Sequence, residues 1–220
     1  TFQFAAHHGD KAGLDGLLTY TIARHYPELE DSPNKALALL AAVMERQADL
    51  IVHWMRVGFI HGVMNTDNMT LSGEAIDFGP CAFMDAFDPQ TVFSSIDHMG
   101  RYAYGNQPKI ALWNLTRLAE TLLPLIDDDT AQAVKLAESE LNKFAPLYEQ
   151  KWLTMMRHKL GLDGAQEGDV KLITDLLDWM QKHGADYTNS FYDLTYDNLL
   201  GAEIYQSKPF TDWHQQWTQR

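Results

Sequence analysis

Apolar side chains recur at helical spacing along much of the chain, which predicts a mainly helical protein. Over residues 10–26, and again over about 34–57, apolar positions lie three and four residues apart. The first stretch ends before Pro27, and the second follows Asp31-Ser32-Pro33, a typical helix start. In the second stretch we expect one buried stripe, made of Leu37, Leu40, Val43, Met44, Leu50, Ile51 and Trp54.

The same periodicity returns in the second half of the chain. It predicts helices from Pro108 to about 123, from a cap at Asp127–Asp129 to about Leu160 with a kink at Pro146, from Gly168 to about Lys182, and over 212–219.

Residues 59–80 break the helical pattern. Short apolar pieces alternate there with Gly, Asn, Asp and Thr, which is typical of small strands joined by tight turns. A loop-rich region follows to residue 107. We therefore expect a mainly α fold, helical with one small β-hairpin that carries polar loops.

Composition and charge narrow the class of protein. The 220 residues are 45% hydrophobic and 21% charged, as in an ordinary globular domain, and no apolar run approaches the roughly 20 residues that span a bilayer. The net charge of −13 argues against nucleic-acid and membrane partners. Cys81 is the only cysteine, so an intrachain disulfide and a cysteine zinc site are excluded. With no secretory leader visible at Thr1, we expect a reducing, cytoplasmic location.

Three polar residues in the central segment suggest metal chemistry. They are Asp67, Asn68 and Asp77, and Gly73 between them allows the chain to double back and bring residue 77 beside residue 68. Magnesium prefers hard oxygen ligands, usually one or two carboxylates together with substrate phosphates. An Asn carbonyl and an Asp carboxylate therefore predict a metal site that leaves coordination positions for a nucleotide.

The spacing of this segment resembles the two catalytic loops of protein kinases. His61 corresponds to the kinase His, Asn68 follows seven residues later as the metal-binding Asn does, and Asp77-Phe78-Gly79 corresponds to the second loop. Val63 occupies the position of the usual catalytic Asp and cannot accept a proton. Asp67 is the nearby replacement, either as a general base or as a stiffener of the loop through an Asx turn.

The wider sequence resembles the selenoprotein O (YdiU) family. The resemblance is carried by His61 to Met69, Ile76 to Pro80 and Phe83 to Asp85, and it continues through Phe87-Asp88-Pro89, Ser95 to Arg101, Gln107-Pro108 and Ala111 to Leu115. It also includes Thr1 to Phe4, Arg24 to Pro27 and Ala185 to Asn189.

This resemblance implies a protein-kinase-like fold that transfers AMP from ATP to Ser, Thr or Tyr hydroxyls of proteins. Asp67 would accept the proton, and Asn68 and Asp77 would hold Mg²⁺ or Mn²⁺ and, through it, ATP; UMP transfer is not separated from AMP transfer. Family members are about twice as long, and their amino-terminal lobe carries further nucleotide contacts. We therefore expect residues 1–220 to be the carboxy-terminal lobe alone, a fragment that lacks its amino-terminal lobe and is inactive by itself.

Two other classes stay open at this point. A small-molecule kinase also has His-Gly and Ile-Asp-Phe-Gly, although Val63 argues against it. A pseudokinase scaffold would explain Val63 but not the retained pair Asn68 and Asp77. A separate group, Asp97, His98 and Arg101, either braces the metal loop or substrate groove or forms a simple polar cap.

Overall fold

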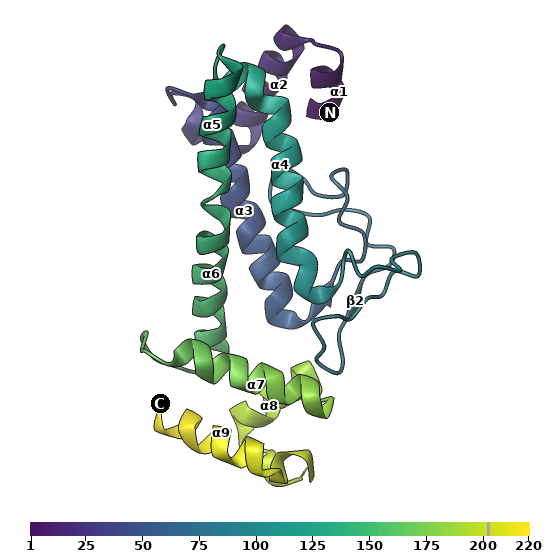
Figure 1. Ribbon diagram of the computed structural model, residues 1–220, viewed down its shortest axis with the longest axis vertical. Helices are drawn as coiled ribbons and strands as arrows, with labels where there is room; N and C mark the ends of the chain where they lie inside the picture. The colour runs from purple at the N-terminus through teal and green to yellow at the C-terminus, as the bar shows by residue number, and fades with distance from the viewer. Residues whose placement is uncertain (202) are drawn as a thin grey trace. The chain divides into compact units, whose positions relative to one another are not determined.

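The long apolar stripe predicted over 34–57 forms helix α3 (Lys35–Val57) in a computed structural model that describes residues 1–201 and 203–220 (Figure 1). Asn34 precedes the helix, and its side-chain oxygen accepts a 3.0 Å hydrogen bond from the amide of Leu37, which caps the first turn. Most of the expected stripe is buried, and Leu37 and Leu50 are half-buried. The helical periodicity therefore identified the buried face correctly.

The described residues pack as two compact units, each built from separate stretches of the chain. Unit 1 contains Thr1–Ile51, Met64–Asp77 and Pro108–Tyr148, and unit 2 contains Val52–Val63, Phe78–Gln107 and Glu149–Arg220.

Unit 1 is a group of helices around the first part of α3. Its other helices are α1 (Phe2–His7), α2 (Lys11–His25), the 3-10 turn η1 (Pro27–Leu29), most of α4 (Gln107–Ile126) and α5 (Thr130–Leu141). α3, α4 and α5 are drawn as long, roughly parallel coils in Figure 1. The start of α3 meets the end of α4, where Asn34 Nδ2 donates to the carbonyl of Ile126 over 2.9 Å. The loop 64–77 belongs to this unit.

Unit 2 holds a two-stranded sheet and the C-terminal helices. Strand β1 (Phe59–Ile60) pairs antiparallel with β2 (Ala82–Phe83), with Phe59 opposite Phe83. The unit continues through η2 (Tyr104–Asn106), most of α6 (Phe144–Lys159), α7 (Asp169–His183), α8 (Tyr187–Tyr196), η3 (Leu199–Gly201), η4 (Glu203–Gln206) and α9 (Lys208–Gln219). α7 and α9 pack along each other (Figure 1).

The carbonyls at the end of α3 are capped inside unit 2 by residues far along the chain. Met55 O accepts hydrogen bonds from the hydroxyls of Tyr104 at 2.6 Å and Tyr187 at 2.8 Å. Lys159 donates to the carbonyl of Arg56 and lies 4.3 Å from the centre of the Tyr187 ring. Because the last carbonyls of a helix have no partner within it, these donors satisfy groups that the helix itself leaves without hydrogen bonds.

Four expectations about the elements need correction. The helix predicted from 127–129 to about 160 is two helices, because α6 begins at Phe144 and Pro146 lies in its first turn, where proline is tolerated. α9 starts at Lys208 rather than 212, with Pro209 in its first turn. α1 and α8 were not predicted. α8 follows Asp186, whose side chain accepts from Asn189 N over 2.7 Å, but Leu194 is its single aliphatic residue, so the sequence there gave little apolar signal.

The expected hairpin within 59–80 is confirmed only in part. β1 lies where strands were predicted, but its partner β2 lies beyond residue 80. Inside the predicted range the structure has a single antiparallel bridge between Met69 and Ala75.

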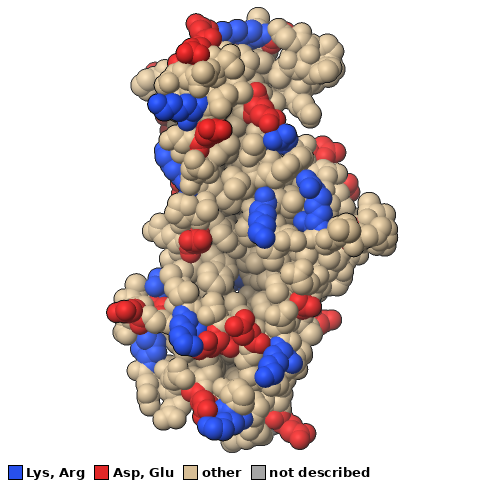
Figure 2. All heavy atoms as spheres, in the orientation of Figure 1, with Lys and Arg blue, Asp and Glu red and all other residues tan. Residues whose placement is uncertain are grey.

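The apolar character of the helices and the distribution of surface charge were also compared with the sequence expectations. Among the described helices, none combines the length and apolar character needed to cross a membrane. On the face shown in Figure 2, acidic and basic side chains are interspersed.

Candidate functional site

The candidate site is a tight loop in unit 1 that returns on itself between Asn68 and Ile76. The amide of Ile76 donates to the carbonyl of Asn68 over 2.9 Å, and the amide of Thr70 donates to the carbonyl of Glu74 over the same distance. Gly73 turns the chain with φ of +86°, a conformation that costs other residues about 1–2 kcal/mol. A Cβ at this position would lie 2.6 Å from Cβ of Arg46, so only glycine fits. The predicted doubling back at Gly73 is confirmed.

Side chains of α3 and of Tyr26, which directly follows α2, hold the turn in place. Gln47 Nε2 donates to the carbonyl of Thr70 over 2.7 Å, and the hydroxyl of Tyr26 donates to the carbonyl of Leu71. Arg46 donates to the carbonyls of Ser72 at 3.4 Å and His25 at 2.8 Å, and its guanidinium lies 4.0 Å from the Tyr26 ring centre. Burial raises the pKa of Tyr26 to about 12, so its hydroxyl stays protonated as a donor.

The two predicted metal ligands lie at the two ends of this loop. Asn68 is buried, with 7% of its surface exposed, whereas Asp77 is exposed. Asp77 also has a φ of +61°, one of two non-glycine residues with positive φ in the described chain. Such strained backbone is concentrated at functional sites in proteins, and here it follows directly after the Ile76 hydrogen bond.

The donor set fits Mg²⁺ or Mn²⁺ bound together with a nucleotide. The Asn68 amide oxygen and the Asp77 carboxylate are hard ligands, and an octahedral ion held by two protein groups keeps positions for phosphate oxygens and water. Within the described residues there is no group of three or more His, Cys, Asp or Glu that could hold a metal by itself. Asn68 and Asp77 would supply two oxygen ligands, and a magnesium ion in proteins is usually held by one or two such groups together with substrate phosphates.

Asp67 presents an accessible carboxylate. It is exposed, and it makes no hydrogen bond or ion pair within residues 1–201 and 203–220. An Asx turn would require this carboxylate to accept a local amide hydrogen bond, and none is present. Of the two roles considered for Asp67, the structure therefore disfavours the loop stiffener and leaves the carboxylate available to a substrate hydroxyl.

His61, which corresponds to the kinase His, is fully buried in unit 2. Its ring lies 5.5 Å from that of Trp54 and 5.3 Å from that of Phe78, measured between centroids. Its Nδ1 is 3.3 Å from the amide of Val63. His61 therefore orders the start of the loop from within the core.

Gln107 is a supporting residue that sequence reasoning did not single out. Its side chain is buried, accepts from the amide of His61 at 3.1 Å and donates to the carbonyl of Phe59 at 2.9 Å. The sequence named Gln107 only within the Gln107-Pro108 part of the family resemblance, and it gave no sign of a structural role. Gln107 bonds to residues of the β1 segment that lie more than 40 positions away in the chain, and such long-range contacts cannot be predicted from local sequence.

The Asp97 carboxylate caps a local turn. Its two carboxylate oxygens accept from the amides of Arg101 at 2.8 Å and Tyr102 at 2.7 Å. Both hydrogen bonds close the local turn in unit 2, as the polar-cap alternative predicts for Asp97.

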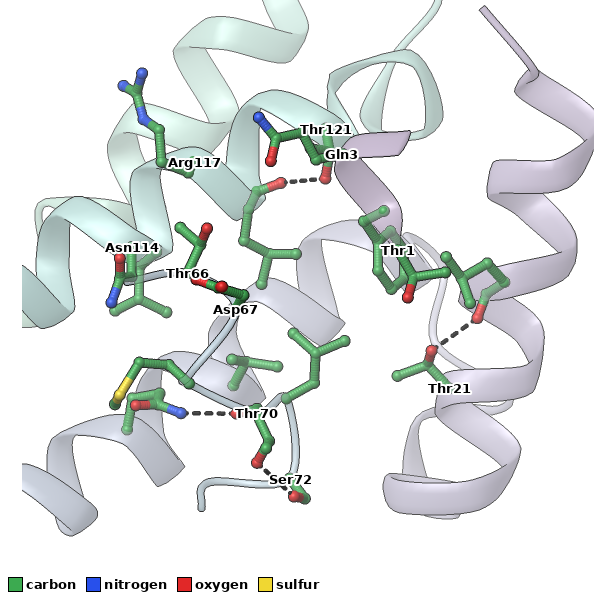
Figure 3. A pocket seen from close by; sticks show the side chains of 18 of the residues that line it. Thr1, Gln3, Thr21, Thr66, Asp67, Thr70, Ser72, Asn114, Arg117 and Thr121 are labelled. Atoms are coloured by element: carbon green, nitrogen blue, oxygen red, sulfur yellow. Dashed lines mark hydrogen bonds between the residues drawn. The ribbon is translucent and has the colours of Figure 1, made fainter. Parts of the chain in front are cut away.

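A cleft of about 640 Å³ lies next to Asp67 in unit 1 (Figure 3). Its walls come from residues 1–3, α2, α3, the loop 66–72 and α4. Figure 3 shows Thr66 and Asp67 at the centre of the view, with Asn114 and Arg117 on one side and Thr21 on the other. Asp67 lines this cleft, whereas Asn68 and Asp77 do not.

Comparison with known proteins identifies the family. The family model described as "Protein adenylyltransferase SelO" matches residues 1–217. The chain is 62% identical over its full length to the protein nucleotidyltransferase YdiU of Alcanivorax borkumensis, covering 46% of that protein. It is 57% identical to the YdiU protein of Halalkalibacterium halodurans and 55% to that of Nitrosococcus oceani, in each case covering 45% of the relative.

This chain belongs to the SelO/YdiU family, whose curated members are named as protein nucleotidyltransferases. The predicted resemblance is confirmed. The chain spans about half the length of the curated relatives it matches.

Proposed function

We propose that the full-length protein is an adenylyltransferase that moves AMP from ATP to Ser, Thr or Tyr hydroxyls of proteins, and that this chain supplies its metal-binding and proton-accepting residues. The observation that carries the proposal is the geometry of the loop 67–77. The amide of Ile76 donates a hydrogen bond to the carbonyl of Asn68, which brings the two ends of the loop together, and the Asp67 carboxylate stays accessible. The family's printed descriptions support the same reaction class.

In this proposal the residues have separate roles. The Asp67 carboxylate takes the proton of the acceptor hydroxyl, and the hydroxyl oxygen attacks the α-phosphorus of ATP. The bond from the α-phosphorus to the bridging oxygen breaks, and pyrophosphate leaves with that oxygen. Asn68 and Asp77 would hold Mg²⁺ or Mn²⁺, which when bound stabilises negative charge on the phosphates. Val63 in place of the usual kinase base supports a reaction other than ordinary γ-phosphoryl transfer.

The fold proposed for the chain is the carboxy-terminal lobe of a kinase-like protein. Its mainly helical content, its small sheet and the position of the catalytic loop after a long helix are consistent with that label. We also propose that the 220 residues are inactive alone, because the relatives carry as much sequence again. Self-modification by the isolated chain above an Asp77→Asn control would overturn that part.

The test uses the full-length parent with ATP and either Mg²⁺ or Mn²⁺, analysed by intact-mass spectrometry. Addition of AMP, absent in Asp77→Asn, is the expected result. Parallel reactions with UTP decide whether UMP is transferred instead. Addition of phosphate would turn the assignment to a kinase.

A non-catalytic scaffold is the second candidate, and the loss of a kinase-type Asp at Val63 is the observation that favours it. Metal-dependent ATP binding that is lost in Asp77→Asn, without transfer to the protein or to added acceptors, would establish this alternative.

A further inference from the structure

We propose that Gln47 is a positioning residue for the predicted metal ligands. Its hydrogen bond to the tip of the loop 68–77 sets where Asn68 and Asp77 lie, and so how tightly the metal–ATP complex binds. This inference rests on the proposed function and adds a residue of α3 to the nucleotide site. All the groups that carry it belong to unit 1.

Gln47 occupies a position of α3 where the helical period predicts an apolar side chain. It follows Val43 and Met44 by four and three residues and precedes Ile51 by four, and these three side chains are buried. Only 4% of the Gln47 surface is exposed. A buried amide lowers stability unless its polar atoms have hydrogen-bond partners, so we expect Gln47 to have a partner that an apolar residue could not bind.

That partner is the tip of the loop. Gln47 Nε2 donates to the carbonyl of Thr70 over 2.7 Å (Figure 3), and this bond fixes the orientation of the amide because a carbonyl can only accept. The next carbonyl, that of Leu71, accepts from the hydroxyl of the buried Tyr26. Two consecutive carbonyls at the tip are therefore held by buried side chains from outside the loop.

The loop connects this anchored tip to the two predicted metal ligands. Its arms are paired from the tip to the open end by contacts between Thr70 and Glu74, Met69 and Ala75, and Asn68 and Ile76. A short two-stranded hairpin is only marginally stable by itself in water, so its placement depends on such anchors. A looser tip should let Asn68 and Asp77 shift, and magnesium demands near-ideal octahedral geometry from its ligands.

The substitution Gln47→Met isolates this contact. Methionine is also long and unbranched and suits the apolar stripe, but it cannot donate a hydrogen bond. The carbonyl of Thr70 keeps a second donor, the amide of Gly73 at 3.3 Å, and is not left without a partner. We therefore expect Gln47→Met to fold with the loop held less firmly.

The experiment uses the full-length parent with Mn²⁺ and α,β-methylene-ATP, whose α–β bridge cannot be cleaved. In calorimetry, Gln47→Met should bind this complex about three- to tenfold more weakly, the effect of one hydrogen bond. Hydrogen–deuterium exchange without metal or nucleotide should be faster in peptides that cover residues 68–77. In transfer assays the KM for ATP should rise by the same factor, while kcat at saturating ATP stays close to the wild-type value.

Two further variants separate positioning from a general loss of stability. Asn34→Ser removes another side-chain amide of unit 1 that donates to a main-chain carbonyl, that of Ile126 at 2.9 Å, and serine still caps α3. It should lower the melting temperature about as much as Gln47→Met does, without changing nucleotide affinity. Tyr26→Phe removes the donor to Leu71 and should reproduce the weaker binding and the faster exchange, so it decides the question if Gln47→Met does not fold.

Each outcome decides the proposal. Wild-type affinity in Gln47→Met, or unchanged exchange over residues 68–77, overturns the proposal and leaves the proposed function standing. Equal weakening in Gln47→Met and Asn34→Ser overturns it as well, because stability alone would then explain the effect. A wild-type parent that binds the metal–nucleotide complex but transfers no AMP from ATP would instead contradict the proposed function, and the binding data would still decide the role of Gln47.

Discussion

The amide of Ile76 donates a 2.9 Å hydrogen bond to the carbonyl of Asn68, so two residues eight positions apart in the sequence are main-chain neighbours. Asp77 directly follows Ile76. The hydrogen bond therefore fixes, relative to Asn68, the stretch of main chain from which the Asp77 side chain extends. The strained φ of +61° at Asp77 then directs the chain away from the loop. Several measurable consequences depend on this arrangement.

Asp67→Asn should reduce catalysis without affecting folding. The carboxylate is exposed and makes no hydrogen bond or ion pair within residues 1–201 and 203–220, so the free energy of unfolding should change by less than about 0.5 kcal/mol. Loss of a general base should lower the kcat of the full-length parent roughly 10²- to 10⁴-fold, with the KM for ATP unchanged. Asp15→Asn, an exposed acid on α2, is the control and should leave kcat unaltered. A kcat near the wild-type value in Asp67→Asn would remove Asp67 from the chemistry.

Substitutions at Asp77 should separate backbone strain from metal binding. Asp77→Gly, Asp77→Asn and Asp77→Ala all remove the carboxylate, and each should abolish metal-dependent ATP binding measured by calorimetry on the parent. Their stabilities should differ, because Gly tolerates the positive φ and Ala does not, so Asp77→Ala should be about 1 kcal/mol less stable than Asp77→Gly. Equal melting temperatures for the two would contradict the strained conformation.

Gly73→Ala should destabilise unit 1 and displace the loop. The alanine would have to adopt the positive φ, and its added Cβ would lie 2.6 Å from the Cβ of Arg46. Together these penalties should lower the free energy of unfolding by roughly 2–4 kcal/mol, measured by chemical denaturation. Gly161→Ala is the matched control, since its φ is +66° with no atom within 4 Å of the added Cβ. It should lose only about 1 kcal/mol, and a loss as large as that of Gly73→Ala would argue against the contact with Arg46.

The buried carboxylate of Asp169 should dominate acid unfolding of unit 2. It accepts hydrogen bonds from Arg220 and Arg157 at 2.6 Å each, and chiefly the Arg220 contact holds its pKa well below the ordinary value. With a native pKa lower than that of the unfolded chain, its stabilisation is present above about pH 4 and is lost as pH falls further.

Asp169→Asn should therefore cost roughly 3–5 kcal/mol at pH 7, and the difference from wild type should shrink below pH 4. Melting temperatures of the two proteins recorded from pH 7 to pH 2 check this. Parallel curves for wild type and Asp169→Asn would show that another group governs acid unfolding.

Lys159 should make stability rise with pH on the alkaline side, in the same direction as Asp169 does in acid. Burial, with a smaller contribution from the charge of Arg56, lowers its pKa to about 8. The unfolded chain keeps this proton to a pH of about 10.4, so wild-type stability should rise from pH 8 to pH 10 relative to Lys159→Met. Lys135→Met, at an exposed position on α5, should show no such rise relative to wild type. A constant difference between wild type and Lys159→Met across this range would contradict the lowered pKa.

The sequence predicted the local features of the site well. The spacing of Asn68, Gly73 and Asp77 was sufficient to predict the turn, because glycine at a reversal and polar residues on both sides specify a short-range structure. The face of α3 that is buried followed from its 3.6-residue period. The assignment of Asn68 and Asp77 to a metal and of Asp67 to proton transfer stays a prediction.

Long-range partners could not be predicted in the same way. Periodicity indicates that a helix buries one face, but it does not indicate which residue meets that face. The bridge from Gln107 to the β1 segment and the hydrogen bond from Gln47 to the carbonyl of Thr70 emerge only when separate segments are placed together. α8 was missed for a related reason, since a helix rich in aromatic and polar residues is stabilised by its neighbours and not by its own pattern.

The capping of Met55 has a consequence for the order of events during synthesis. The carbonyl of Met55 is complete early, but its donor Tyr187 lies 132 residues further along the chain. At translation rates of roughly 5–20 residues per second, this carbonyl waits about 7 to 26 seconds for that partner. A nonsense codon before residue 187 would therefore release a chain whose second unit cannot close, and quality-control proteases would meet an exposed helix end.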